Sequence, residues 1–187
     1  MLFETLENFE WYNDPENVRF EGEAMDIYAK KNTDFWQSIH RGFKKDSGHF
    51  FFSRQDKNFI LTMKWHFDEI DKFSQCGIML RIDERNWFKA SIMNDDEDGD
   101  VLASSLTIGG HSDWSGFSLK KSIQDIWFRL NRVDDDYIVS YSLDGIDFIK
   151  MRLFYMQSYE EVKVGAYIAS PNKEKFHAML SNIQIEL

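Results

Sequence analysis

Short runs of alternating apolar and polar residues extend along most of the chain, and clusters of Asn, Asp and Gly separate one run from the next. Such alternation predicts β-strands, because successive side chains of a strand point to opposite faces of its sheet. A hairpin is predicted within residues 142–153, since Asp144-Gly145 between apolar residues is a strong hairpin signal. The other predicted strands are residues 25–31, 49–55, 58–67, 76–83, 87–93, 126–133, 137–143, 161–170 and 177–187.

Helical patterns are nearly absent from the sequence. No run of about 11 or more residues keeps the i, i+3, i+4 spacing of an amphipathic helix, and only a helical turn near residues 14–17 is expected. No internal repeat or low-complexity linker divides the chain. Many strands without helices between them predict one all-β domain over residues 1–187, an antiparallel two-sheet sandwich or barrel.

The alternation also sorts side chains onto two faces. On three predicted strands one face is apolar, and we expect these residues to meet in a common core: Cys76, Ile78, Leu80, Ile82, Phe88, Ala90, Ile92, Ile126, Phe128 and Leu130. We expect the opposite faces to form one shared surface, which carries Gln75, Arg81, Trp87, Lys89, Trp127 and Arg129. Because Cys76 falls in the core set, its thiol is expected to be buried and unreactive.

The shared surface combines indoles with cations in a chain that is acidic overall, and this combination indicates a binding site. Tryptophans beside hydrogen-bonding groups suit a groove that stacks on a flat apolar ligand surface, such as the face of a sugar. Cations suit carboxylate or phosphate groups. The alternative is structural: a loop covers Trp87 and Trp127, and the cations pair with neighbouring Asp and Glu side chains.

The segment "TIGGHSDWSGF", residues 107–117, gathers serines, a histidine, an aspartate and a tryptophan. A catalytic triad is assembled by folding and not by adjacency, and the segment lacks the strand-to-helix context of a nucleophile elbow. We therefore expect a loop in which Asp113 and the serines bond their own backbone while Trp114 packs inward. In the alternative, the same loop forms the rim of a groove beside the shared surface.

Composition narrows the classes of partner. The 187 residues are 16% aromatic, which favours β structure. The net charge of −10 argues against nucleic acid, because phosphate binding needs Lys and Arg gathered on one face. With one cysteine, no internal disulfide forms. Since no apolar segment approaches about 18 residues and no basic-then-apolar leader is present, we expect no membrane span and a cytoplasmic protein.

The acidic turns do not match the carboxylate pattern of a glycosidase or of an EF-hand. A sandwich glycosidase needs two carboxylates on one strand face, but Asp96, Asp98 and Asp100 surround a glycine in a predicted turn. Asn94, Asp96 and Asp98 mimic the start of a calcium loop, yet the twelfth position is not Glu and flanking helices are missing, so an EF-hand is rejected. Weak calcium binding by this turn or by residues 134–136 stays open. The five histidines show no metal-ligand spacing, and we expect no catalytic residue, metal site or cofactor.

Five segments, in this order along the chain, carry a family resemblance: "TDFWQSIHRGFKKDSGHFFF", "QCGIMLRIDERNWFKASI", "HSDWSGF", "WFRLNRVDDDYIVSYSLDGIDFIKMR" and "VGAYIASP". From about Trp11 to the end, the chain resembles the regulation-of-enolase family of domains of unknown function. This resemblance implies a concanavalin A-like jelly-roll sandwich, the fold of legume lectins and many glucanases.

The resemblance also implies a set of recurrent positions. They map to Asp34, Phe35, Trp36, Gly48, His49, Gln75, Gly77, Arg81, Asp83, Trp87, Lys89, Ser112, Asp113, Trp114, Ser115, Arg129, Ser142, Asp144, Gly145, Arg152, Gly165, Ser170 and Pro171. The chain departs from the family after the Trp-x-Lys motif, where relatives often carry Gly and then Glu two positions later. Here these places hold Ser91 and Met93. A carboxylate that served catalysis in relatives would be missing from this chain.

The sequence therefore predicts a non-catalytic jelly-roll module that binds a small polar or anionic ligand such as a carbohydrate. The expected ligand-binding residues are Gln75, Arg81, Trp87, Lys89, Trp114 and Arg129. A regulatory protein-interaction domain, with the same face covering a partner protein, is the alternative from another class. A glycan-active enzyme that has lost recognisable carboxylate spacing is a weaker third possibility.

Overall fold

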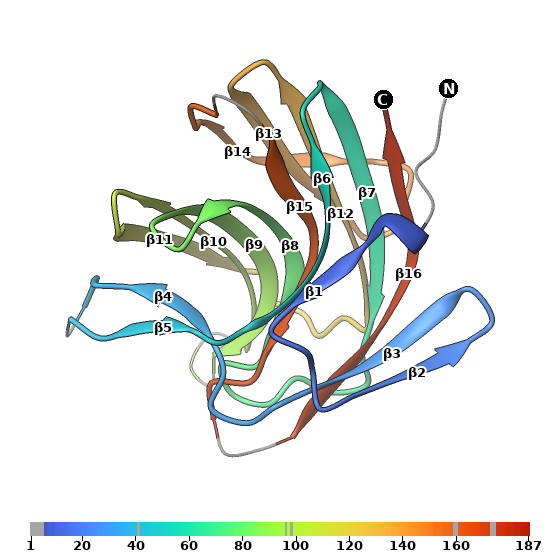
Figure 1. The fold of residues 1–187 in the computed structure, drawn as a ribbon. Helices are drawn as coiled ribbons and strands as arrows, with labels where there is room; N and C mark the ends of the chain where they lie inside the picture. The colour runs from blue at the N-terminus through green and yellow to red at the C-terminus, as the bar shows by residue number, and fades with distance from the viewer. Residues whose placement is uncertain (1–5, 41, 96, 98, 159–160, 173–174) are drawn as a thin grey trace.

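Two antiparallel sheets of seven strands each face one another in the computed structural model, which describes residues 6–40, 42–95, 97, 99–158, 161–172 and 175–187 (Figure 1). The first sheet has the order β1-β6-β15-β8-β9-β10-β11, with bounds Glu10–Tyr12, His49–Gln55, Val162–Ala169, Gln75–Asp83, Asn86–Asp95, Gly99–Ile108 and His111–Ser118. The second sheet has the order β14-β13-β12-β7-β16-β3-β2, with bounds Ile149–Tyr155, Asp136–Ser142, Asp125–Val133, Phe59–His66, Phe176–Glu186, Ala24–Ala29 and Asn17–Glu21. The predicted antiparallel two-sheet sandwich is confirmed.

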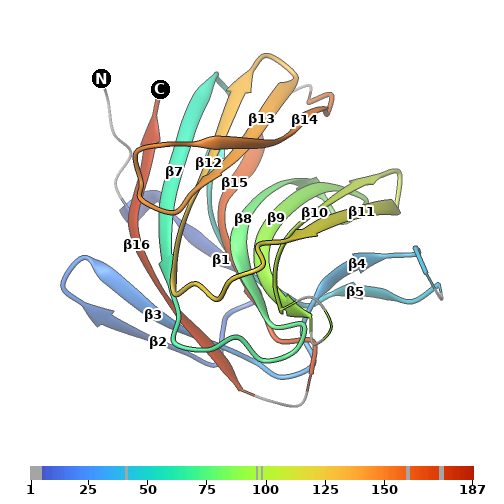
Figure 2. The ribbon, with the colours of Figure 1, turned by 180° about the vertical axis from the view of Figure 1, so that it is seen from behind.

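A small hairpin belongs to neither sheet. It consists of β4 (Phe35–Gln37) and β5 (Lys44–Asp46), which pair only with each other. Figures 1 and 2 both show it beside β8–β11, on the side of the first sheet that faces away from the second sheet. The hairpin therefore leaves the sandwich intact and adds a wall to its outer surface.

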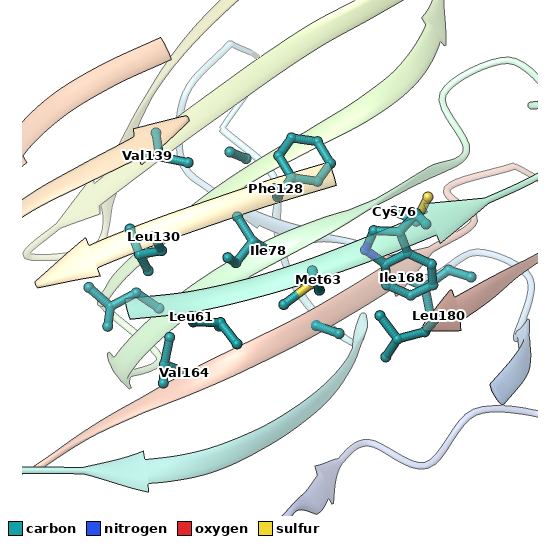
Figure 3. Packing of buried hydrophobic residues seen from close by; sticks show 14 of the residues in the cluster. Leu61, Met63, Cys76, Ile78, Phe128, Leu130, Val139, Val164, Ile168 and Leu180 are labelled. Carbon is teal, nitrogen blue, oxygen red and sulfur yellow. The ribbon is translucent and has the colours of Figure 1, made fainter. Parts of the chain in front are cut away.

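The core lies between the two sheets, as the alternation predicts (Figure 3). Ile78 from β8 and Phe128 and Leu130 from β12 are fully buried there. Cys76 is also buried in this core, and burial raises the pKa of its thiol well above the ordinary value. The predicted core face and the burial of Cys76 are both confirmed.

Three local expectations differ from the structure. Residues 14–17 form no helix, and the helical piece in the described chain is a short 3-10 turn, η1 (Leu6–Asn8). The hairpin at Asp144 is confirmed, but its connection spans residues 143–148, because Asp144 Oδ1 accepts the N–H groups of Ile146 and Asp147 in a wider turn. Six strands were not predicted: β1, β2, β4, β5, β10 and β11.

His49 joins three segments at the start of β6. Its ring is 1% exposed, the Lys30 N–H donates to Nε2 at 3.0 Å, and Nδ1 lies 2.8 Å from the Asn13 carbonyl oxygen. Nε2 must therefore be the acceptor, and Nδ1 carries the proton that is donated to Asn13. Burial lowers the pKa of His49 below its ordinary value of 6.5. The neutral ring is the form that the fold requires.

This arrangement predicts acid sensitivity. In the unfolded chain His49 takes up a proton as the pH falls through 6.5, whereas in the folded chain it resists protonation. The unfolded state then binds more protons, so the contribution of His49 to stability is complete above about pH 6.5 and is lost as the pH falls below it. Urea unfolding between neutral and mildly acidic pH measures this loss. The H49Q variant should show a shallower slope than the wild type, whereas H111Q, which removes an exposed histidine, should keep the wild-type slope. Equal slopes in all three proteins would contradict the assignment.

Candidate ligand-binding site

A cavity of about 550 Å³ lies on the outer face of the first sheet, under the β4–β5 hairpin. Strands β8, β9, β10 and β11 contribute its floor and one side, and the hairpin contributes another. The lining residues are Asp34, Trp36, His40, Phe43, Phe73, Gln75, Lys89, Ser91, Met93, Asp95, Ala103, Ser104, Ser105, Trp114 and Pro171. The volume falls in the range of small-molecule sites.

A buried hydrogen-bond network forms the floor. Lys89 Nζ donates to Asp34 Oδ1 at 3.0 Å and to Gln75 Oε1 at 2.9 Å. The Tyr167 hydroxyl donates to the same Gln75 oxygen at 3.0 Å, and burial raises the pKa of Tyr167 well above its ordinary value, so it remains a donor. Since an ammonium has three donors, these two bonds leave one N–H of Lys89 for a ligand.

Aromatic side chains form the walls. Trp36 stacks on Phe43 with ring centroids 5.9 Å apart, and its Nε1 donates to the Ile39 carbonyl at 2.9 Å. Trp114 comes from the edge strand β11 and is 44% exposed. A Cβ at Gly116 would lie 2.7 Å from the Trp114 ring, so the indole can lie there only because residue 116 has no side chain. Two indoles from separate elements thus border one cavity.

The hairpin is held against the sheet at its base. Arg81 donates through Nη1 and Nη2 to the two carboxylate oxygens of Asp46, at 2.6 and 2.8 Å, and the Tyr12 hydroxyl donates to Asp46 at 2.7 Å. Phe35 packs in a second buried cluster with Trp87 and Tyr167. These contacts fix the position of the wall that carries Trp36.

The predicted ligand-binding residues separate into three groups. Gln75, Lys89 and Trp114 line the cavity. Arg81 and Trp87 lie on the same face of the first sheet, but they are 3% and 0% exposed beneath the hairpin. These two residues follow the structural alternative, in which they bind no ligand. The β4–β5 hairpin covers the Trp87 indole, and Asp46 pairs with the Arg81 guanidinium.

Arg129 lies elsewhere, and the expectation of one shared surface is wrong. Strand β12 pairs with β7 and β13 in the second sheet, so Arg129 and Trp127 face outward on the opposite side of the sandwich. The Arg129 guanidinium stacks on Phe148 at 3.6 Å, and its Nε donates to Thr62 at 3.3 Å. Alternation shows which residues share a face of a strand, but it does not show to which sheet the strand belongs.

The "GGHSDWSG" segment is a strand and not a loop. Gly109 and Gly110, both at positive φ, make the turn, and residues 111–118 then pair along β10 as β11. Trp114 does not pack inward but borders the cavity, so the rim alternative is correct. Partial burial of Asp113 acts to raise the pKa of its carboxyl group. The bidentate hydrogen bonds from Arg152 and the bond from the Leu106 N–H outweigh this effect, so the pKa of Asp113 lies below its ordinary value.

Alternation did not predict most of the residues that form the walls of the cavity. Asp34, Trp36 and Phe43 belong to or flank strands of three residues each, which are too short for alternation to detect. The family resemblance did point to Asp34 and Trp36. Ser91 and Met93, the two positions where the chain departs from the pattern that the resemblance implies, also line the cavity.

The described residues show neither a metal-binding cluster nor a membrane-spanning helix. Among the described residues, no three His, Cys, Asp or Glu side chains form a group that could hold a metal ion. No helix in the described ranges is long and apolar enough to cross a bilayer. Asp96 and Asp98 lie outside the described residues, so weak calcium binding at that turn stays a prediction, as it does at residues 134–136.

The fold and sequence are similar to those of several known proteins. "Regulation of enolase protein 1" of Saccharomyces cerevisiae is 29% identical over 163 residues, which are 87% of this chain and 81% of that protein. The crystal structure of a functionally unknown protein from Saccharomyces cerevisiae matches with a TM-score of 0.90 at 28% identity and covers 97% of both chains.

More distant structures share the jelly-roll fold. The carbohydrate-binding module CBM66 from Bacillus subtilis matches with a TM-score of 0.60 at 11% identity, covering 95% of both chains. A xylan beta-1,4-xylosidase from Bacillus halodurans C-125 matches with a TM-score of 0.68 at 10% identity, over 96% of this chain and 38% of that one. The implied concanavalin A-like jelly roll is confirmed. With a family model that matches residues 11–187, the chain belongs to the family described as "Protein of unknown function (DUF1349)".

Proposed function

We propose that the chain is a non-catalytic binding module whose cavity under the β4–β5 hairpin holds a small, uncharged polar ligand such as a carbohydrate. The observation that carries the proposal is the pairing of two indoles, Trp36 and Trp114, with a hydrogen-bonding floor at Lys89 and Gln75 in one cavity. Flat aromatic faces bind the apolar faces of sugar rings, and a few fixed polar groups orient the hydroxyls.

The charges of the cavity favour a neutral ligand over an acidic one. Lys89 is the one Lys or Arg among the described lining residues, and Asp34 already neutralises it. Asp95 adds a second carboxylate to the lining. A carboxylate or phosphate on the ligand would therefore meet no unpaired cation and would be repelled by Asp95. For this cavity we therefore propose a neutral ligand and not the anionic one that the sequence also allowed.

The carboxylates also favour binding over catalysis. A glycosidase needs one carboxylic acid to protonate the leaving oxygen and a second carboxylate as nucleophile or base. Of the two lining carboxylates, Asp34 accepts from Lys89 and from the Phe35 N–H through the same oxygen. Met93 presents a thioether to the cavity at the position where the family resemblance implies Glu. The carbohydrate-binding module among the fold neighbours supports the same choice by analogy.

The proposal predicts that Trp114→Ala weakens sugar binding by about two- to tenfold, since an aromatic contact contributes about 0.5–1.5 kcal/mol beyond buried area. Isothermal titration calorimetry with neutral monosaccharides and disaccharides measures the affinity without relying on tryptophan emission. Trp127→Ala is the matched control, because that indole lies on the second sheet. The proposal fails if no neutral sugar gives saturable heat in the millimolar range, or if both variants bind alike.

A further inference from the structure

A second hollow, of about 370 Å³, lies on the other side of the β4–β5 hairpin. Three segments that are distant in sequence border it. They are the β4–β5 hairpin, the turn between β8 and β9, and the turn between β10 and β11, which contribute Lys44, Lys45, Asp46, Glu84, Arg85 and His111 among others. None of the residues that line the first cavity lines this one.

The charge of the second hollow is opposite to that of the whole chain. Lys44, Lys45 and Arg85 border it together with two carboxylates, in a chain whose net charge is −10. One of these carboxylates, Asp46, is already neutralised by its ion pair with Arg81. Because Asp46 is neutralised and the Lys45 ammonium belongs to the other face of the hairpin, the two cations Lys44 and Arg85 exceed the one remaining carboxylate, Glu84. A concave surface of this kind attracts anions.

Arg85 is held in position for a ligand. Its Nη2 donates to the Gly109 carbonyl at 2.8 Å, and the side chain packs against Gly110, where an added Cβ would lie 3.3 Å from Arg85 Nε. A guanidinium has five N–H donors in a fixed plane, so most of them remain for a ligand. Because the Arg85 guanidinium is already held in one position, ligand binding costs less side-chain entropy.

Lys44 completes the set of donors. It is exposed, and among the residues that the structure describes it forms no ion pair closer than 4.0 Å. Lys45 lies opposite Trp36 in the β4–β5 pair, and its Nζ donates to the Asn32 carbonyl at 3.1 Å, so its ammonium belongs to the other face of the hairpin. A planar fork and an ammonium group beside one hollow match the several oxygens of a tetrahedral anion.

We propose that the second hollow binds a phosphate or sulfate group, a tetrahedral oxyanion, at Arg85 and Lys44. Among the described lining residues of the first cavity the one Lys or Arg is Lys89, which is paired with Asp34, so the two sites select ligands of different charge. The group is either a free inorganic anion or the ester group of a larger molecule, and the chemistry of recognition is the same in both cases.

Titration calorimetry on the whole chain with sulfate, inorganic phosphate and glucose 6-phosphate tests the proposal, in buffers brought to equal ionic strength with chloride. We expect saturable binding of sulfate and phosphate, and about tenfold weaker binding in the Arg85→Gln and Lys44→Gln variants, because hydrogen bonds to charged groups are the strong ones. Lys57→Gln, which removes an exposed lysine from the turn before β7, is the control that should bind as the wild type does.

The outcomes are distinct. Tighter binding of glucose 6-phosphate than of phosphate would assign the site to an ester group, and the reverse order would assign it to the free anion. Absence of saturable heat with all three compounds would overturn the proposal, as would unchanged affinity in Lys44→Gln, a surface change that does not disturb the β10–β11 turn. Neutral sugars should not compete with sulfate, so this result is independent of the proposed function.

Discussion

Replacing Lys89 with methionine should lower the free energy of unfolding by about 3–5 kcal/mol, the loss expected when one partner of a buried ion pair is removed. The side chains of Lys89 and Asp34 are only 5% and 10% exposed. Methionine would leave the Asp34 carboxylate buried without a cation and would leave the Gln75 oxygen with one donor fewer. Urea unfolding of the variant and the wild type measures the difference.

A double variant separates the ion pair from the packing. Asp34→Asn combined with Lys89→Met removes both charges, so it should be more stable than Lys89→Met alone, even though it carries one more substitution. If Lys89→Met is as stable as the wild type, the ammonium contributes nothing to stability, and the hydrogen bonds of Lys89 to Asp34 and Gln75 do not support the cavity floor.

Gly77→Ala should destabilise the fold by about 3 kcal/mol or more, because the new methyl group would overpack the centre of the first sheet. A Cβ built at Gly77 lies 1.9 Å from the Ala90 carbonyl oxygen of β9, which is backbone and cannot rotate away. The Gly77 carbonyl also accepts the indole N–H of buried Trp65 at 3.0 Å, so a shift of β8 would disturb the core on its other face. Chemical denaturation gives the size of the loss.

Gly22→Ala is the comparison. Gly22 lies in the β2–β3 turn at a φ of +64°, with nothing within 4 Å of a built Cβ. Its substitution carries only the cost of a left-handed backbone, about 1–2 kcal/mol. If the two variants lose the same free energy, close approach of the strands is not the reason that residue 77 is glycine.

Alternation predicted the core well, because it is a direct consequence of strand geometry. Ile78, Phe88 and Phe128 are all fully buried, as their positions on the apolar faces indicate. Strand β10 escaped prediction because both of its faces are covered: Leu102 packs in the core, whereas Ser105, at 0% exposure, faces the cavity. A strand that is buried on both sides by small polar and apolar residues shows no clear alternation.

The site was predicted only in part, and the missing part depends on pairing. Gln75, Lys89 and Trp114 come from three strands of one sheet, whose outer face borders the cavity. Arg129 was misplaced because the partners of β12 are decided by long-range packing. Trp87 was assigned to a ligand although Phe35 covers it, since a strand of three residues gives no signal in the sequence.

The floor residue Lys89 has Phe88 and Ala90 as its neighbours along β9, and both side chains are anchored in the core. The position of the ammonium is thus set by the whole sandwich before any ligand arrives. Ligand binding at this floor should therefore restrict few additional side-chain torsions, so little affinity is lost to ordering of the protein. Diversification of the ligand during evolution would then proceed through the hairpin, where Trp36 and Phe43 can be exchanged without repacking the interior.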